Sequence, residues 1–564
     1  MKSTSFIFAL AILLTSLCVA QEKPVPGQRA VTVAPPDSMA QSARQEPAAS
    51  NQALPKFEIP EYVITGIVSI DLPDASKQGA DELPQKPDLA DPSASLRDRS
   101  TYDFTVEQKS TQVSESRLAG TGRLQASSGT YLTSHLGLRH TIVDPTSFIS
   151  IGADYRVANA FIPHANRSGG EASVGGGFHL RDPGIWYDGG LLGGGIGFGS
   201  ETYRFYGSQN PTVARTLTTL KIDARYESPR QLLVLYDAAL GLQLRTIKDS
   251  TASLTETLFN ARTGLNFFVG KIPLDLGVDF TLGSVTVTTT KALPYLDGRI
   301  STERLWFGDF YLQASVHGYL AQGMLNQKLA RVYPHVVLGY QILRNTQLSV
   351  SYAGRVQQNT LAGLVARHPY IGAHATLRQS DIPIDVTALL ETDWSPVWRT
   401  RLSIRYQSIR DLPLFTGSGV RGIWMTDYRG TTRIGTYRGD LFAKFTANSY
   451  FTVSAEINDN KNTATEWKVP YLPDVRLTGG AQLEVIPDLT VCPTLQYVGM
   501  RVPDLFVAGK LSGYFSANLH AEYSVIRAFS VALDVLNLTN ARYEEWSGYR
   551  SVPLTVTGGL TLRW

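Results

Sequence analysis

Long stretches of the chain alternate apolar and polar residues at every second position. Between residues 272 and 282, apolar side chains occupy the even positions, and Pro, Asp, Gly or Thr occupies each odd position. The same alternation recurs at residues 232–244, 398–406 and 451–457, and a last run ends at Trp564. A period of two is typical of β-strands that have one apolar face and one polar face.

The length of these runs decides between two classes of β-protein, because strands of soluble β-sandwiches alternate as well. Soluble strands average about 5–6 residues, whereas these runs often extend over about 10–15 residues. Membrane-spanning strands need about 9–11 residues. Lipid offers no hydrogen-bond partner to an open sheet edge, so a sheet that spans a membrane must close on itself. The pattern therefore predicts an all-β fold, a transmembrane antiparallel β-barrel over residues 115–564.

Residues typical of tight turns recur along the sequence of the predicted barrel. If each is a periplasmic turn, the intervening text supplies two strands and one outer connection, which gives about 22 strands. Both ends of the barrel then lie on the periplasmic side, as expected of single-chain outer-membrane barrels. Bulky aromatic residues beside the turns fit an interfacial girdle. The turn signals are Asp144-Pro145, Asp182-Pro183-Gly184, Ser228-Pro229, Gly270, Gly308-Asp309, Arg344-Asn345, Ser395-Pro396, Asn448-Ser449, Pro487-Asp488 and Arg527.

The predicted outer connections differ in length along the chain. Those at residues 127–129 and 249–251 are short, whereas those at 358–381, 411–431 and 459–473 are long. Short connections leave little surface for ligand capture, so the first half of the barrel favours a pore or an assembly role. The long connections of the second half favour capture of a ligand.

The N-terminal region lacks this alternation. Residues 1–20 combine a basic start, a short apolar run and small residues before a cleavage site, which predicts Sec-type export and cleavage near Ala20. Residues 21–56 have the composition of a Pro-rich periplasmic linker. Residues 57–72 form a short strand-like apolar segment, and 73–114 are a polar linker or a vestigial plug. This organisation predicts a chain located in the outer membrane of a Gram-negative cell.

Composition and charge exclude several functions. A net charge of +3 over 564 residues gives no electrostatic case for nucleic acid. Signal cleavage would remove Cys18 and leave Cys492 alone, so no intramolecular disulfide is predicted. The nearest pair of histidines, His368 and His374, has no carboxylate or cysteine at metal-ligand spacing. We therefore predict no metal, no cofactor, no catalytic residues and no enzymatic activity.

Two glycine clusters, at residues 175–177 and 193–199, invite comparison with a phosphate-binding loop. They alternate with apolar residues in a pattern typical of strands, and no helix is predicted after them. We therefore predict close strand packing rather than nucleotide binding.

The last eight residues form a second pattern with a physical meaning. A polar residue, a glycine, alternating hydrophobic residues and an aromatic terminus are typical of a strand recognised by the outer-membrane assembly machinery. The residues that carry the pattern are Thr557, Gly559, Leu562 and Trp564. The same strand would then meet outer-membrane lipid with its apolar face.

Two longer segments carry a family resemblance. Residues 529–564 (FSVALDVLNLTNARYEEWSGYRSVPLTVTGGLTLRW) contain an Asn-Leu step, a Gly-Tyr loop and an aromatic end. Residues 347–414 run in the order strand, outer loop, Trp-Ser-Pro turn and rising strand. Both segments resemble the barrel of TonB-dependent outer-membrane receptors. The resemblance implies solute transport across the outer membrane.

A shorter segment is similar to the energy-coupling box of that family. It consists of Glu61, Tyr62, Val63, Ile64 and Thr65. The resemblance implies that this segment adds as a strand to a TonB-like periplasmic protein. Family receptors carry a globular plug of over a hundred residues between the box and the barrel, yet here only about fifty residues separate the box from the first strand. The chain is therefore predicted to be plugless. Three states of the lumen are then expected: it is filled by the segment 57–72, it is filled by a separate plug chain, or it is open as in a porin.

The polar face of the strand after Trp398 carries Arg399, Arg401 and Arg405. Inward charges are expected in any wet lumen, and a basic stripe that favours anionic solutes is the sharper hypothesis. The sequence thus supports a TonB-dependent-receptor-like transport barrel. The alternative is a passive pore or structural scaffold without energy coupling.

Overall fold

The computed structural model describes residues 122–564, with gaps at 145, 182–186, 188, 230–231, 251, 288 and 507–508. The predicted signal peptide, both linkers and the Glu61–Thr65 segment lie outside the described residues. The predicted barrel start at residue 115 does so as well.

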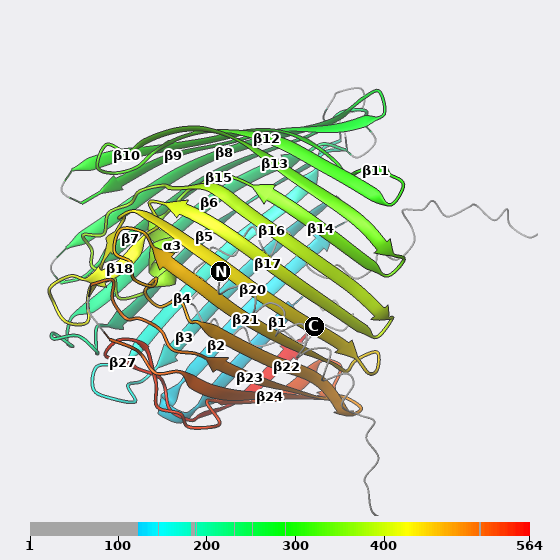
Figure 1. The fold of residues 1–564 in the computed structure, drawn as a ribbon. Coiled ribbons are helices and arrows are strands. Elements are labelled where there is room, and N and C mark those ends of the chain that lie inside the picture. The colour runs from blue at the N-terminus through cyan, green and yellow to red at the C-terminus, as the bar shows by residue number, and fades with distance from the viewer. Residues whose placement is uncertain are drawn as a thin grey trace, which may run out of the picture. The chain divides into compact units, whose positions relative to one another are not determined.

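Within the described residues, 22 long antiparallel strands form one closed barrel (Figure 1). Both the fold class and the strand number therefore confirm the sequence prediction. The first half of the wall comprises β1 (Gly122–Gly129), β2 (Ser134–Asp144), β3 (Ser147–Ala158), β4 (Arg167–His179), β5 (Leu191–Arg204), β6 (Ala214–Glu227), β7 (Leu235–Lys248), β8 (Ser253–Val269), β9 (Ile272–Thr286), β10 (Thr290–Thr302) and β12 (Phe310–Gln322). The second half comprises β13 (Lys328–Leu343), β14 (Thr346–Ala353), β16 (Ser380–Ser395), β17 (Trp398–Arg410), β20 (Thr431–Lys444), β21 (Tyr450–Asn462), β22 (Val475–Ile486), β23 (Leu489–Val498), β24 (Tyr514–Ile526), β25 (Phe529–Leu536) and β28 (Thr555–Arg563).

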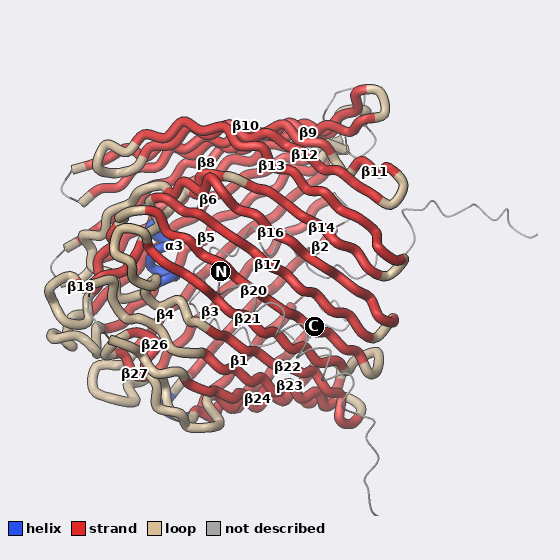
Figure 2. Tube along the Cα trace, in the orientation of Figure 1, coloured by secondary structure: helices blue, strands red, loops and turns tan. Residues whose placement is uncertain are grey.

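Shorter strands and helices lie at the two ends of this wall. Two short strands continue the wall beside β12 and β16, and two small hairpins and two short helices lie in the connections (Figure 2). They are β11 (Leu305–Phe307), β15 (Arg355–Gln357), the hairpin β18 (Leu414–Gly417) with β19 (Trp424–Asp427), the hairpin β26 (Glu544–Trp546) with β27 (Tyr549–Arg550), the 3-10 helix η2 (Thr130–Leu132) and α3 (Leu361–Arg367). Among the described residues, no helix has the length and apolarity needed to cross a membrane.

The barrel closes where the first described strand pairs with the last. β1 and β28 are antiparallel, with Arg123 opposite Arg563 and Gly129 opposite Thr557. Each other long strand pairs with its sequence neighbour, so the sheet has no free edge along this ring. Closure satisfies the backbone groups that a membrane leaves without partners.

The predicted turn residues that the structure describes lie where consecutive long strands of the wall meet, and Asp144 and Ser395 are the last residues of β2 and β16. Gly270 and Gly308 take positive φ values of 65° at two of these turns, a conformation that glycine adopts without strain. The predicted outer connection at residues 127–129 is wrong by a few residues. Ser127 and Ser128 still pair with β28, and the connection is made by η2, where Tyr131 has a φ of 58°.

The two faces of the wall differ as the alternation predicts. In β9, Val278 and Leu282 are 42% and 49% exposed, whereas Asp279 on the other face forms an ion pair with Arg299 at 3.2 Å. An exposed apolar band around a closed barrel is the surface that faces lipid. The buried apolar side chains gather instead at the end of the barrel that carries the long connections. By the usual asymmetry of such barrels, that end is the outer mouth.

The glycine clusters lie in β4 and β5, where Gly175 pairs with Gly195 and Gly177 with Gly193. A Cβ atom at Gly176 would lie 2.6 Å from the carbonyl oxygen of Phe148. The clusters therefore permit close strand packing, as predicted.

Candidate functional site

The connection between β14 and β16 is the structural centre of the outer mouth. Its helix α3 begins after Thr360, whose hydroxyl accepts a hydrogen bond from the Gly363 N–H at 3.1 Å. A side-chain oxygen at this position satisfies one of the free amides of the first turn. The helix ends at Arg367, and His368 after it is extended because Pro369 follows.

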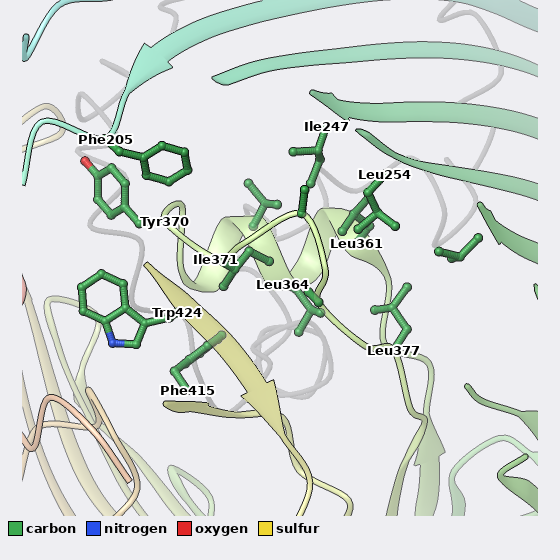
Figure 3. Close-up of a cluster of buried hydrophobic side chains, with 14 of the residues drawn as sticks. Phe205, Ile247, Leu254, Leu361, Leu364, Tyr370, Ile371, Leu377, Phe415 and Trp424 are labelled. Atoms are coloured by element: carbon green, nitrogen blue, oxygen red, sulfur yellow. The ribbon is translucent and has the colours of Figure 1, made fainter. Parts of the chain in front are cut away.

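The apolar side of α3 faces the barrel wall rather than solvent. Leu361 and Leu364 are 0% and 1% exposed, and they belong to one buried cluster with Ile247 of β7 and Leu254 of β8 (Figure 3). The root of the connection lies between β14 and β16, and β9, β10, β12 and β13 separate that root from β8 around the wall. The connection, residues 358–379, therefore extends from its root to a distant part of the mouth. We call it the mouth loop.

Polar side chains of the wall hold the mouth loop at that distant part. Arg215 of β6 donates to the carbonyl oxygens of Pro369, at 3.2 Å, and Ile371. The Tyr203 hydroxyl donates to the same Pro369 oxygen at 2.6 Å. Glu256 of β8 accepts a hydrogen bond from the Leu361 N–H at 2.8 Å. Three strands of the wall thus contact the loop through hydrogen bonds.

Amide side chains fasten the root of the mouth loop. Gln327 donates to the Gln379 carbonyl at 2.9 Å and accepts from the Gln379 N–H at 2.7 Å. Asn359 donates through its side chain to the Arg378 carbonyl at 2.7 Å. All three amide residues are at most 7% exposed, so these bonds are shielded from water. The loop is thereby held at both ends.

A second layer of outer connections packs on the mouth loop. Gly372 donates to the Trp424 carbonyl at 2.7 Å, and Trp424 donates back to the Tyr370 carbonyl at 3.1 Å. The Tyr549 hydroxyl, from the connection between β25 and β28, donates to the Gly422 carbonyl at 2.7 Å. The connections therefore interlock over the outer mouth.

His368 occupies the centre of this layer. Its ring is 0% exposed and lies against Phe415, Trp424 and Tyr471, with centroid distances of 4.9, 4.5 and 5.1 Å. Burial lowers the pKa of the imidazole well below its ordinary value of 6.5, and the charge of Arg215 lowers it further. Its Nδ1 accepts the Tyr370 N–H at 3.3 Å, and its Nε2 has no hydrogen-bond partner among the described residues.

The structure separates the histidine pair that the sequence singled out. His368 is buried, whereas His374 is exposed. Within the described part of the chain, no group of three metal-ligating side chains lies close enough to hold an ion.

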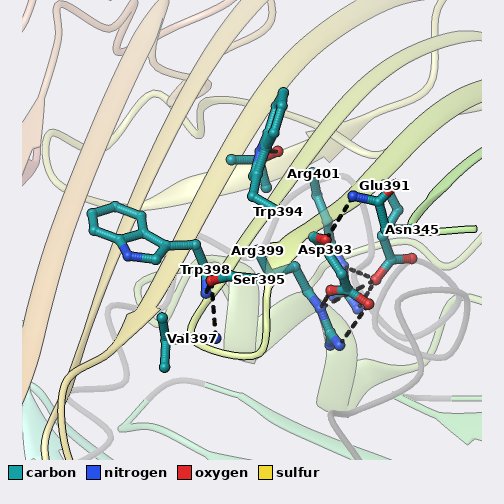
Figure 4. Close-up of polar contacts among 10 residues, drawn as sticks. Asn345, Glu391, Asp393, Trp394, Ser395, Val397, Trp398, Arg399 and Arg401 are labelled. Carbon is teal, nitrogen blue, oxygen red and sulfur yellow. Dashed lines mark hydrogen bonds and ion pairs between the residues drawn. The ribbon is translucent and has the colours of Figure 1, made fainter. Parts of the chain in front are cut away.

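The three arginines of the predicted stripe lie on one face of β17. Arg401 donates to Glu391 at 2.8 and 2.9 Å, and Arg405 donates to Asp385 at 2.7 and 2.8 Å. Arg399 forms an ion pair with Asp393, near the turn after β16 (Figure 4). Carboxylates of β16 thus balance the positive charges.

The same turn carries two residues of the predicted aromatic girdle. Trp394 and Trp398 are 67% and 42% exposed, and their indoles are drawn apart from the arginine ion pairs (Figure 4). The Trp394 indole donates to the Thr400 hydroxyl at 2.9 Å, so its polar edge has a partner.

The residues of the predicted assembly signal form β28 and the residue after it. Thr557 is 8% exposed, whereas Leu562 and Trp564 on the other face are 44% and 47% exposed. Gly559 pairs with Ser127 of β1 and Ala532 of β25. Whether the assembly machinery reads this strand stays a prediction.

Sequence reasoning missed the wall side chains that hold the mouth loop. Tyr203, Arg215 and Glu256 are polar residues near outer strand ends, and nothing in their local pattern distinguishes them from other lumen residues. Their partners are more than a hundred residues away in the chain.

Comparison with known proteins places the fold. No family model and no curated protein sequence matches the chain. Among solved structures, the FrpB iron transporter from Neisseria meningitidis has a TM-score of 0.63 and 11% identity, over 79% of this chain and 81% of its own. The copper transporter OprC has a TM-score of 0.62 and 11% identity, over 78% and 80%.

The pyoverdine outer membrane receptor FpvA from Pseudomonas aeruginosa has a TM-score of 0.61 and 11% identity, over 79% of this chain and 78% of its own. At such identities the likeness concerns the fold. It confirms the predicted resemblance to the barrel of TonB-dependent outer-membrane receptors.

Proposed function

We propose that the chain is an outer-membrane barrel that transports a solute and is energised through the segment Glu61–Thr65. The observation that carries the transport part is a closed 22-strand barrel whose outer mouth is covered by its own interlocked connections. A barrel of this size without internal obstruction has a lumen wide enough to leak solutes. A covered mouth is what a selective transporter needs and a scaffold does not.

Support for transport also comes from the neighbours in fold. Their names describe an iron transporter, a copper transporter and a pyoverdine receptor. The proposal places this chain in the outer membrane after export and cleavage near Ala20, in contact with outer-membrane lipid and with the assembly machinery. No nucleic acid, cofactor or catalytic activity is part of the proposal.

Energy coupling rests on the sequence of residues 61–65 alone. Tyr62, Val63 and Ile64 have strong strand propensity and are flanked by residues of linker composition, so a strand formed here would need a partner strand. We propose a TonB-like periplasmic protein as that partner, with a separate plug chain as the other possibility. Pairing would use main-chain hydrogen bonds.

Site-directed crosslinking in cells tests the coupling. A photo-crosslinker at Tyr62 or Ile64 should capture a periplasmic protein, and Val63→Pro should abolish the capture because proline removes a donor. Barrel assembly should stay normal, since barrel closure starts at Gly122. Absence of any crosslink in both positions would leave no support for energy coupling.

The second candidate is a passive pore or assembly scaffold. The short connections between β1 and β2 and between β7 and β8 favour it, because they offer little surface to a ligand. Growth on a limiting solute, with and without the chain, separates the candidates. A scaffold would affect the level of a partner protein and leave solute uptake unchanged.

A further inference from the structure

We propose that Arg215 is the positioning residue that keeps the mouth loop closed, so that the loop is the main barrier to solute flow. The inference rests on the proposed transport function and concerns its regulation. A barrier formed by a wall-anchored loop requires no plug domain.

Arg215 is held in place by the wall while it bonds to the mouth loop, and we call this arrangement the latch. Its side chain is 0% exposed, and its guanidinium forms an ion pair with Asp249 at 3.2 Å while lying over the Phe205 ring at 4.5 Å. The same group donates to the carbonyl oxygens of Pro369 and Ile371 in the mouth loop. A planar guanidinium serves several acceptors in fixed directions, which a lysine ammonium at one point does not do equally well.

Arg215 contacts the mouth loop far from the strands between which the loop leaves the wall. The loop leaves the wall between β14 and β16, and Arg215 holds it at β6, with β7 to β13 between them around the ring. Glu256 holds the first turn of α3, and Arg215 holds the segment after the helix. Without Arg215, the Ile371 carbonyl would lose its donor from this part of the wall, while the Pro369 carbonyl would keep the Tyr203 hydroxyl.

Loss of Arg215 penalises the closed loop far more than the open loop. In the closed loop, the Ile371 carbonyl would lose its donor, whereas the Pro369 carbonyl would keep the Tyr203 hydroxyl and the Asp249 carboxylate would keep the Ala252 N–H. A buried acceptor without a partner is costly, whereas the same group in an open loop bonds to water. The ratio of open to closed loops should therefore rise on the order of tenfold or more.

Conductance of the purified full chain in planar bilayers tests the latch. Arg215→Ala should raise the open fraction about tenfold, and Arg215→Lys should lie between it and the native chain. The matched control is Arg225→Ala, which removes the same charge from the same face of β6. Arg225 is 56% exposed and does not contact the loop, so this variant should behave as the native chain.

Limited proteolysis gives a readout that does not depend on conduction. Arg367 is 6% exposed in the closed loop, so trypsin should cut after it slowly in the native chain and faster in Arg215→Ala. Heat-modifiable migration should stay native, which shows that the barrel is assembled. If Arg215→Ala fails to assemble, Tyr203→Phe removes one bond to the loop and should shift both readouts less, in the same direction.

A third variant separates failure of the latch from failure of the transport proposal. Replacement of residues 360–378 by a short Gly-Ser linker should give the largest conductance. A conducting linker variant with a native-like Arg215→Ala overturns the latch and leaves the transport barrel intact. A linker variant that does not conduct overturns the loop as barrier. Faster cleavage without higher conductance overturns it too. Crosslinking from Tyr62 and uptake measurements test the transport proposal separately.

Discussion

Trp564 and Gly122 exchange two backbone hydrogen bonds. The Gly122 N–H donates to the Trp564 oxygen at 2.9 Å, and the Trp564 N–H donates to the Gly122 oxygen at 3.1 Å. The indole stacks on His140 of β2, with ring centroids 5.9 Å apart. A Cβ atom at Gly122 would lie 2.1 Å from the indole, so only glycine fits there without rearrangement. The last residue thus helps to close the barrel on its short-turn side.

Replacement of the terminal indole should lower assembly. Trp564→Ser keeps the backbone but removes the ring that packs on His140, and we expect a several-fold lower amount of heat-modifiable protein in outer membranes. Trp564→Phe keeps an aromatic terminus and should assemble nearly as well as the native chain. Equal levels for all three chains would show that the aromatic terminus has no role in assembly.

The facing of β9 predicts unequal effects from two neighbouring substitutions. Leu276 lies on the apolar face, and Leu276→Arg should destabilise the barrel by about 2–4 kcal/mol if it sits at the bilayer midplane. Asp279→Asn, on the other face, should cost below about 1 kcal/mol, because its ion pairs are partly exposed and Arg299 keeps Asp275 as a partner. Urea unfolding in lipid vesicles measures both. Similar costs would mean that the facing is wrong.

The wall of the barrel follows from local sequence, whereas the covered mouth does not. Each turn needs only a short signal, such as Gly270 with its positive φ, and each strand repeats one alternation, in which exposed Val278 is followed by Asp279 with its ion pair to Arg299. The strands of a lipid-facing wall can therefore be predicted from the pattern of residues that are adjacent in the sequence.

The mouth loop depends on contacts between distant segments. Arg215 meets Pro369 across more than a hundred residues of sequence, and no period relates the two. His368 likewise has the local appearance of an exposed loop residue, and its burial depends on rings from two other connections. Such packing is decided by tertiary structure, which a single sequence does not show.

The charges on β17 predict a change of ion selectivity. In the triple variant Arg399→Ser, Arg401→Ser and Arg405→Ser, Glu391 and Asp393 would lose their counter-charges, and Asp385 would keep Arg355. The lumen should then favour cations more strongly. Reversal potentials in a salt gradient measure this, in a background with residues 360–378 replaced so that current flows. Arg421→Ser, in an exposed outer connection, should leave the potential unchanged. An unchanged potential in the triple variant would place these side chains away from the ion path.

The buried imidazole of His368 predicts that the covered mouth loosens in acid. Burial holds its folded pKa well below 6.5, so the native chain stays neutral in a pH range where an unfolded loop would bind a proton. The unfolded loop then binds more protons, and stability of the loop layer falls as pH drops from about 6.5 towards the lowered pKa. Above about pH 6.5 both states are neutral, and this contribution is constant.

Hydrogen exchange of residues 368–377, corrected for intrinsic rates, measures this dependence. Protection should fall between pH 7 and pH 5 in the native chain. His368→Phe fills the same aromatic surroundings without a titrating group, so its protection should stay level over this range. A fall of equal size in both chains would assign the effect to another group. Constant protection in the native chain would show that proton uptake at His368 does not limit opening of the layer.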